Sequence, residues 1–340
     1  MFRFVTGCFM VATFCALSIA TVRASEVNVY SYRQPYLIEP MLEKFTDETG
    51  IKVNVLFAGK GLVDKMVQEG DSSPVDVLLT VDIGRLSDAV NQEVSQSFSS
   101  SVVNANIPSQ YRDPDGHWVG LTARARVVYA SIDRVAQDEI TYEELAGPKW
   151  AGRLCTRSGQ NAYNLALFAS LIAHHGEAET IEWLKGVKAN MARTPQGNDR
   201  GQVKGIFSGE CDISIGNTYY MAKMRTNDKE PEQKDWAASA KIIMPHADGR
   251  GTHMNLSGAV LAKHAPNQDN GIKLIEFLTE DIAQEMYAET NHEYPLKEGV
   301  GISDMVASFG DLNADTLDLI TIANNRVVAS EMVDLVGYDE

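Results

Sequence analysis

Gly216-Asn217-Thr218-Tyr219-Tyr220 is the stretch on which the fold prediction depends. It follows Cys211 to Ile215, a short alternating apolar run that predicts a buried strand. It precedes Met221 to Met224, which favours a helix. Open α/β sheets place their ligand sites where a strand gives way to a helix. The stretch therefore predicts an α/β fold with two adjacent phenols at its binding edge.

The two phenols have two interpretations. Adjacent side chains on an extended segment point to opposite faces, so Tyr219 and Tyr220 need a bend if their hydroxyls are to meet. We expect Gly216 and Asn217 to supply that bend. Converging phenols suit a hard, highly charged cation, because a bound metal ion deprotonates a group whose pKa is ordinarily about 10. Ordinary aromatic packing is the alternative, and the pair alone does not decide between them.

The whole chain limits the class of protein. Residues 1–24 are predicted to be a cleaved signal peptide, with a basic start at Arg3, an apolar run and small residues before the cleavage point. The formal net charge is −16, and loss of Arg3 and Arg23 brings it to −18. That charge argues against a nucleic-acid partner, which requires a basic face. The remaining length of roughly 315 residues exceeds one comfortable core, so two lobes are expected.

Two cysteines, Cys155 and Cys211, remain after the signal peptide. In an oxidising compartment such a pair favours a disulfide, with a free buried pair as the alternative.

The first part of the mature chain alternates strands and helices. The strands are predicted at 27–30, 51–55 and 74–79, and the helices between them at 37–49 and 62–70. This β-α-β-α-β order predicts a doubly wound parallel sheet. Asp82 follows the third strand and is interpreted as a helix N-cap rather than a ligand.

A long strand is predicted at Trp118 to Ala130. Its length and its internal charges, Arg124 and Arg126, suit a connector between two lobes. Each arginine is either a surface salt bridge or an anion clamp facing the cleft between the lobes. His246 and His253 lie in a later Gly-containing stretch and are expected to be exposed.

The chain resembles the periplasmic ferric-iron-binding proteins of bacterial ABC importers over nearly all of its mature length. The resemblance is carried by the tyrosine pair in its context and by five further stretches: 29–35, 49–53, 73–77, 124–127 and 293–296. It implies a two-lobed α/β fold of the type II solute-binding class, each lobe a doubly wound mixed sheet, joined by crossing strands. The first lobe is expected to comprise 25–124 and about 250–297, and the second 125–249 and about 298–340.

The resemblance also implies a ligand set. Tyr219 and Tyr220 would ligate Fe(III), and Tyr163 would supply a third phenolate. Gln34-Pro35 stands where other branches of the family carry a His or a His-Tyr. The sequence is therefore similar to the branch that completes the metal sphere with carbonate. The residues then expected to hold the anion are Arg33, Gln34 and Arg124, and the less favoured direct ligands are Tyr32, Tyr36 and Asp82.

The function expected from these observations is periplasmic binding of Fe(III), handed to an inner-membrane ABC permease with its ATPase by a monomeric carrier. A carrier of an organic cation or an oxyanion, with the tyrosines stacking on the ligand, is the alternative on the same architecture. A secreted hydrolase is disfavoured because the sequence has no G-x-S-x-G or H-E-x-x-H motif.

Overall fold

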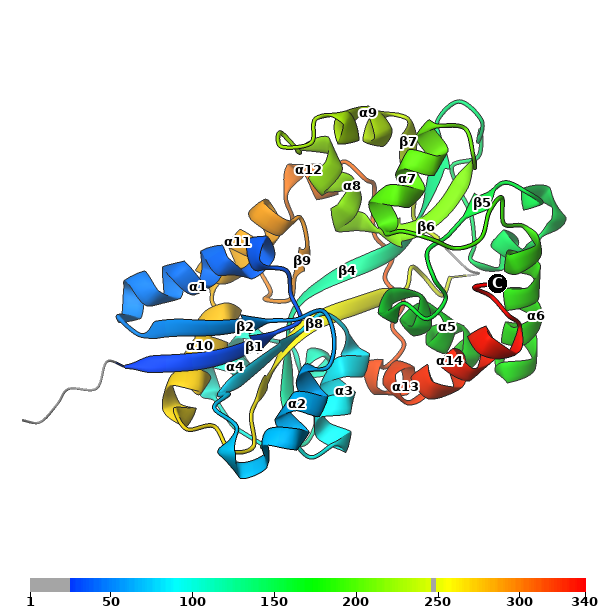
Figure 1. Ribbon diagram of the computed structural model, residues 1–340. Coiled ribbons are helices and arrows are strands. Elements are labelled where there is room, and N and C mark those ends of the chain that lie inside the picture. Colours follow the sequence, from blue (N-terminus) through cyan, green and yellow to red (C-terminus); the bar gives the residue numbers. More distant parts are fainter. Residues whose placement is uncertain (1–24, 246–248) are drawn as a thin grey trace, which may run out of the picture.

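The computed structural model describes residues 25–245 and 249–340 and contains two lobes bridged by two long strands (Figure 1). These strands are β4 (Trp118–Ser131) and β8 (Met254–Leu261), which run antiparallel to each other. The signal-peptide prediction for 1–24 and the prediction for His246 lie outside the described residues. None of the helices within the described ranges has the length and apolar character needed to cross a bilayer.

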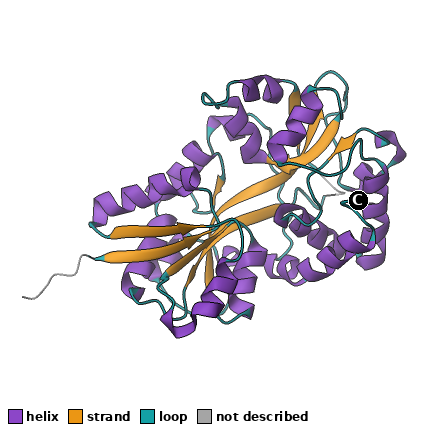
Figure 2. Ribbon diagram, in the orientation of Figure 1, coloured by secondary structure: helices purple, strands orange, loops and turns teal. Residues whose placement is uncertain are grey.

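The first lobe is built on a mixed sheet with the strand order β2-β1-β3-β8-β4. Its parallel part consists of β1 (Glu26–Ser31), β2 (Lys52–Phe57) and β3 (Val77–Thr80). Helices lie on both faces of the sheet (Figure 2). They are α1 (Pro35–Thr49), α2 (Leu62–Glu69), α3 (Ile83–Asn91), α4 (Ser101–Asn106), α10 (Gln268–Thr279) and α11 (Asp281–Asn291).

Local sequence explains the ends of α1. Pro35 occupies the first helical position, where its fixed φ suits the helix and its missing N–H costs nothing. Gly50 ends the helix in the left-handed region at φ 69°, which only glycine adopts without strain, and its N–H bonds to the Thr46 carbonyl. The predicted end of this helix at residue 49 is confirmed.

The long strand β4 changes partners midway along its length. Residues Trp118 to Ala125 pair with β8, whereas Arg126 to Ala130 pair with β6 (Ile213–Asn217). The change falls one residue beyond Arg124, the last residue of the predicted first lobe. We propose that the chain passes from one lobe to the other at this point.

The second lobe surrounds the far half of β4. There β6 and β7 (Ala240–Ile243) both pair with β4, and β5 (Leu154–Cys155) lies parallel to β6. Helices α13 and α14 return from the C-terminal segment and pack on α5, and α13 also contacts α3 of the first lobe (Figure 1). The helices here are α5 (Ala162–His175), α6 (Glu177–Ala189), α7 (Asp199–Phe207), α8 (Thr218–Arg225), α9 (Glu232–Ala238), α12 (Asp304–Ala307), α13 (Leu319–Asn324) and α14 (Arg326–Leu335).

Shorter elements complete the fold. Strand β9 (Tyr294–Pro295) pairs with β4 at Thr122 and Ala123, beside the point where β4 changes partners. The 3₁₀ turns are η1 (Gly70–Ser72), η2 (Ser109–Tyr111), η3 (Glu143–Ala146) and η4 (Pro148–Trp150).

A disulfide joins Cys155 in β5 to Cys211, two residues before β6. The favoured interpretation of the cysteine pair is thus confirmed. The bond ties the edge strand β5 to the strand that leads into the tyrosine pair.

Candidate metal centre

The tyrosine pair lies in the first turn of α8. Strand β6 ends at Asn217 and the helix begins at Thr218, so the chain changes from extended to helical immediately before Tyr219 and Tyr220. Both phenol side chains are buried, and their ring centroids are 4.3 Å apart. The helical turn brings the two rings to one side, as the metal interpretation requires.

Gly216 has a different role from the one predicted. It lies inside β6, and a Cβ atom at this position would come within 2.0 Å of the Tyr129 ring. The Tyr129 hydroxyl in turn donates a hydrogen bond to the Asn217 carbonyl. Glycine is therefore required by close packing under the tyrosine pair, and the start of α8 supplies the bend.

A buried ion network anchors the turn that carries the pair. The fully buried carboxylate of Asp199 accepts a hydrogen bond from the Asn217 backbone N–H at 2.9 Å. It also pairs with Arg126 at 2.8 Å and with Arg157 at 2.9 Å. Burial by itself would raise the pKa of Asp199, but the two guanidinium groups outweigh it and hold this pKa below its usual range. Arg126 is consequently a buried structural cation, and its prediction as a surface salt bridge or anion clamp is wrong.

Tyr163 reaches the pair from another helix. It is the second residue of α5, whose N-cap Asn161 accepts a hydrogen bond from the Tyr163 backbone N–H at 3.0 Å. The Tyr163 hydroxyl lies 3.4 Å from that of Tyr219. The structure thus brings together the three predicted tyrosines on the second lobe.

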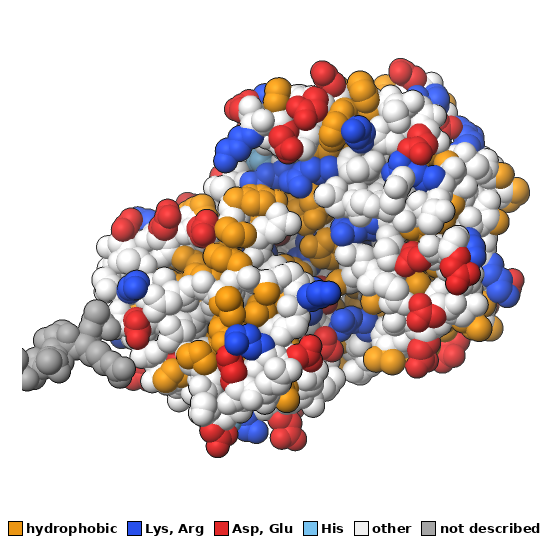
Figure 3. All heavy atoms as spheres, in the orientation of Figure 1, with side chains coloured by type: hydrophobic (Ala, Val, Ile, Leu, Met, Phe, Trp, Pro, Cys, Tyr) orange, Lys and Arg blue, Asp and Glu red, His pale blue; other side chains and the backbone are white. Residues whose placement is uncertain are grey.

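Tyr163 and Tyr219 line a small cavity between the lobes, which we call the site cavity, whereas Tyr220 packs behind Tyr219 and is not part of its lining. Its volume is about 50 Å³, and Tyr163, Tyr219 and Arg124 form its second-lobe and β4 side. Figure 3 shows the hollow between the lobes, with Lys and Arg side chains gathered near its edge. The remaining lining residues are Tyr32, Arg33, Gln34, Leu37, Val81, Ser257 and Glu293.

Two arginines line the site cavity and share one hydroxyl. Oγ of Ser257 accepts a hydrogen bond from Nη1 of Arg33 and another from Nη1 of Arg124, the second at 2.8 Å. Arg33 is also paired with Glu293 at 2.7 Å. In contrast, Nε and Nη2 of the buried Arg124 have no hydrogen-bond acceptor among the described residues. Buried donors are almost always satisfied, so this arrangement suits an anion or ordered water.

The less favoured ligands lie in other environments. The Tyr32 hydroxyl accepts a hydrogen bond from the Val63 backbone N–H at 3.0 Å, although the residue lines the site cavity. Asp82 is the N-cap of α3 and accepts from the Arg85 backbone N–H at 3.1 Å, as predicted. Tyr36 is 42% exposed and lies outside the cavity lining.

His253 contradicts the prediction of exposure. It directly precedes β8 and is buried where the crossing strands pass each other. Burial, together with the nearby guanidinium groups of Arg126 and Arg250, lowers the pKa of His253 to about 3. The imidazole is therefore neutral at physiological pH.

Ser257, Glu293 and Asp199 are site residues that were not predicted from the sequence. Ser257 and Glu293 meet Arg33 across 224 and 260 residues of sequence, respectively. No local pattern predicts such partners. Asp199 had a partial local signal, because Asn198-Asp199 marks a helix start, but its burial did not follow from that signal.

Proton affinity of the phenols governs what the site can bind. Burial, then the neighbouring Tyr163, raises the pKa of both Tyr219 and Tyr220 well above the ordinary phenol value. Both phenols are therefore protonated at neutral pH in the absence of a cation. Any metal ion that they ligate must displace those protons.

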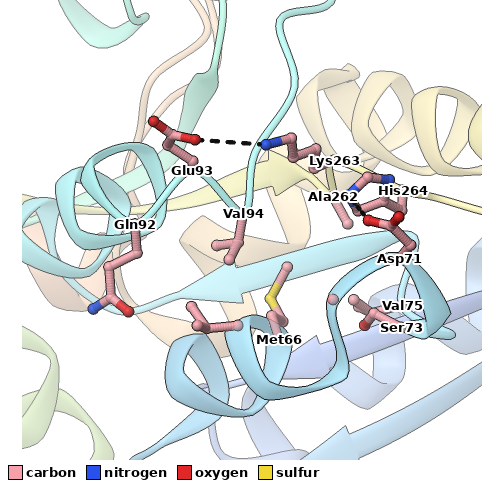
Figure 4. A pocket seen from close by; sticks show the side chains of 12 residues that line it. Met66, Asp71, Ser73, Val75, Gln92, Glu93, Val94, Ala262, Lys263 and His264 are labelled. Carbon is pink, nitrogen blue, oxygen red and sulfur yellow. Dashed lines mark ion pairs between the residues drawn. The ribbon is translucent and has the colours of Figure 1, made fainter.

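A separate hollow of about 230 Å³ lies in the first lobe (Figure 4). Its ionisable side chains lie in pairs: Lys263 lies 3.7 Å from Glu93, and His264 lies 3.0 Å from Asp71. No tyrosine lines this hollow, so it does not share the chemistry of the site cavity.

Residues 55–308 match the family of bacterial extracellular solute-binding proteins, and the chain belongs to this family. It is 43% identical over 316 residues to iron uptake protein A1 of Synechocystis sp., covering 92% of this chain and 87% of that protein.

Among solved structures, apo ferric ion-binding protein A of Pasteurella haemolytica is 52% identical with a TM-score of 0.90, covering 93% of this chain and 99% of the other. Trichodesmium IdiA (FutA), in complex with iron and citrate ligands, is 38% identical with a TM-score of 0.86, covering 92% and 100%. The predicted two-lobed α/β fold and the stated resemblance are confirmed.

Proposed function

We propose that this protein is a monomeric periplasmic carrier of Fe(III) that delivers the ion to an inner-membrane ABC permease with its ATPase. The proposal is supported by its relatives, which are an iron uptake protein and ferric ion-binding proteins. Its role is binding and transport rather than catalysis, in keeping with a solute-binding family.

One observation carries the proposal: phenols from two separate helices converge on one small cavity. Tyr163, Tyr219 and Tyr220 can together supply three negative charges, which neutralise a trivalent ion. Three phenolates do not fill an octahedral sphere, so further ligands are needed.

Carbonate fits the remaining positions. The unsatisfied Nε and Nη2 of Arg124 face the same cavity and would hold two oxygens of a small planar anion. Arg33 and Gln34 line the opposite side and would complete its binding. The oxygen atoms of the anion would then complete the metal sphere in place of first-lobe side chains.

An oxyanion carrier is the second candidate, favoured by the pairing of Arg33 and Arg124 around one hydroxyl. The size of the site argues against an organic ligand. Pockets for such ligands measure about 300–1,000 Å³, whereas the site cavity measures about 50 Å³.

The test is the metal content and visible spectrum of the purified protein after incubation with Fe(III) and bicarbonate. Iron–phenolate bonds absorb visible light, so the wild type should be coloured and should contain one iron per chain. Tyr219→Phe and Tyr220→Phe should each weaken iron binding more than about a hundredfold, since even changes outside the ligand shell cost 10–100-fold.

Tyr338→Phe is the matched control, because Tyr338 is also a buried tyrosine of the second lobe but does not line the site cavity. It should bind iron as the wild type does. Wild-type affinity and colour in either pair variant would show that the tyrosine assignment is wrong.

A further inference from the structure

Tyr36 is held by two cations although it does not line the site cavity. It lies in the first turn of α1, in the first lobe. Nη2 of Arg200 donates to the Tyr36 hydroxyl at 3.4 Å, and Nζ of Lys223 lies 5.6 Å from the centre of its ring. Both cations belong to helices of the second lobe, α7 and α8. The contacts therefore cross from the first lobe to the second.

Arg200 also contacts one of the phenols of the site. The guanidinium carbon of Arg200 lies 5.1 Å from the centre of the Tyr220 ring, so Arg200 lies between Tyr220 and Tyr36. Arg200 also follows Asp199, whose carboxylate fixes the turn before the tyrosine pair.

Lys223 is on the helix of the pair itself, one turn beyond Tyr219. Its ammonium group donates to the Thr290 carbonyl of α11 at 2.5 Å. Because α11 packs against α1, this bond adds a second attachment between α8 and the first lobe.

We propose that Tyr36, Arg200 and Lys223 form a clamp that retains the bound metal ion without ligating it. The proposal rests on the proposed function. Arg200 and Lys223 of the second lobe both contact Tyr36 of the first lobe, and Lys223 also bonds to the Thr290 carbonyl. These contacts are lost when the lobes separate, so they stabilise the closed arrangement relative to the open one. They therefore slow the opening through which a bound ion leaves the site cavity.

The clamp is tested by the rate at which iron-loaded protein loses its colour to an excess of a ferric chelator in stopped flow. Tyr36→Ala removes both contacts, and Arg200→Gln removes the link to Tyr220, so each should release iron about tenfold faster than the wild type. Tyr36→Phe keeps the ring under Lys223 and loses only the hydroxyl. Its rate of iron release should therefore lie between that of the wild type and that of Tyr36→Ala. The iron content at saturation should not change in any of these variants, and the visible band should not change in the two Tyr36 variants.

Lys204→Gln is the matched control. Lys204 lies on the same helix as Arg200, and its Nζ lies 5.1 Å from the centre of the Trp236 ring within the second lobe. This variant should release iron at the wild-type rate.

Three results have distinct meanings. A wild-type release rate in Tyr36→Ala overturns the clamp while leaving the iron-carrier function intact. A shifted visible band in Tyr36→Phe also overturns it, because Tyr36 would then be a direct ligand. A wild type that takes up no coloured iron refutes the proposed function itself.

Discussion

Replacing Asp199 by Asn tests whether the buried ion network holds the tyrosine pair in place. Asn has nearly the shape of Asp but no charge, and its amide N–H₂ group faces one of the two arginines instead of accepting from it. The carboxylate and Arg126 are almost completely buried, and the side chain of Arg157 is only 14% exposed. The substitution therefore leaves two poorly solvated cations without their counter-ion.

The expected loss follows from that burial. Removing one partner of a buried ion pair costs about 3–5 kcal/mol, mainly because the remaining charge stays unpaired. Asp212 provides a matched control, since it too pairs with two arginines, Arg134 and Arg153. Those arginine side chains are 37% and 35% exposed, so water screens them and Asp212→Asn should cost about 1 kcal/mol or less.

Hydrogen exchange read by mass spectrometry is the suitable assay, because a two-lobed chain need not unfold in one step. Amides of residues 213–225 should exchange a hundredfold faster or more in Asp199→Asn, since each 1.36 kcal/mol is about a factor of ten. Asp212→Asn should leave this segment within a few fold of the wild type. Equal exchange in the two variants would refute the argument that burial of the network anchors the turn.

The pH dependence of the anchor has a defined sign. The pKa of Asp199 is lowered in the folded protein, so its stabilising effect is present above the ordinary Asp pKa of 3.8 and is lost only as pH falls through the lower folded value. The effect of Asp199→Asn on exchange should therefore be the same at pH 7 and pH 5. Loss of iron within that interval must come from other groups.

Three further predictions concern the site and the fold. The raised pKa values of Tyr219 and Tyr220 mean that iron must displace their protons. Competition against a chelator should therefore show iron affinity falling by roughly a hundredfold or more per pH unit on acidification. An affinity that is flat between pH 7.5 and 6 would contradict phenolate ligation. Arg124→Ala should keep iron on the tyrosines but favour the open form, which small-angle scattering with and without bicarbonate should detect. Equal closure of the wild type and the variant in both conditions would exclude an anion bridge through Arg124. The disulfide between Cys155 and Cys211 closes a loop with a sequence separation of 56, so its removal should lower the free energy of unfolding by about 4 kcal/mol. Urea denaturation of the oxidised and the reduced wild type would measure this difference, and equal midpoints would contradict the estimate.

The sequence predicted those features of the fold that depend on short-range patterns. The apolar alternation before Gly216 and the helix signals around Gly50 follow from the preferences of neighbouring residues, and both elements formed. The long strand from Trp118 was also recognisable, because charged residues inside a continuous apolar run are unusual. The tyrosine pair was recognisable because its two members are adjacent in the chain.

The remaining features depend on contacts between distant segments. Tyr163 was selected by resemblance to a family, since nothing near it in the sequence indicates that α5 begins beside α8. The burial of His253 was missed because its Gly-containing neighbourhood is typical of a loop, whereas the crossing of β4 and β8 encloses it. The role of Gly216 was misjudged because the Tyr129 ring that requires it lies on another strand.

The distribution of charge around the site cavity indicates which groups each lobe contributes to binding. The three phenols belong to the second lobe, so that lobe can neutralise a trivalent ion without the first. The first lobe contributes Arg33, but Glu293 already neutralises its charge. Arg124 is different, because two of its guanidinium nitrogens have no acceptor among the described residues and it directly precedes Ala125, the last residue of β4 that pairs with β8. An anion bound there would join the metal to the strand that links the lobes, and closure would then depend on the anion as well as on iron.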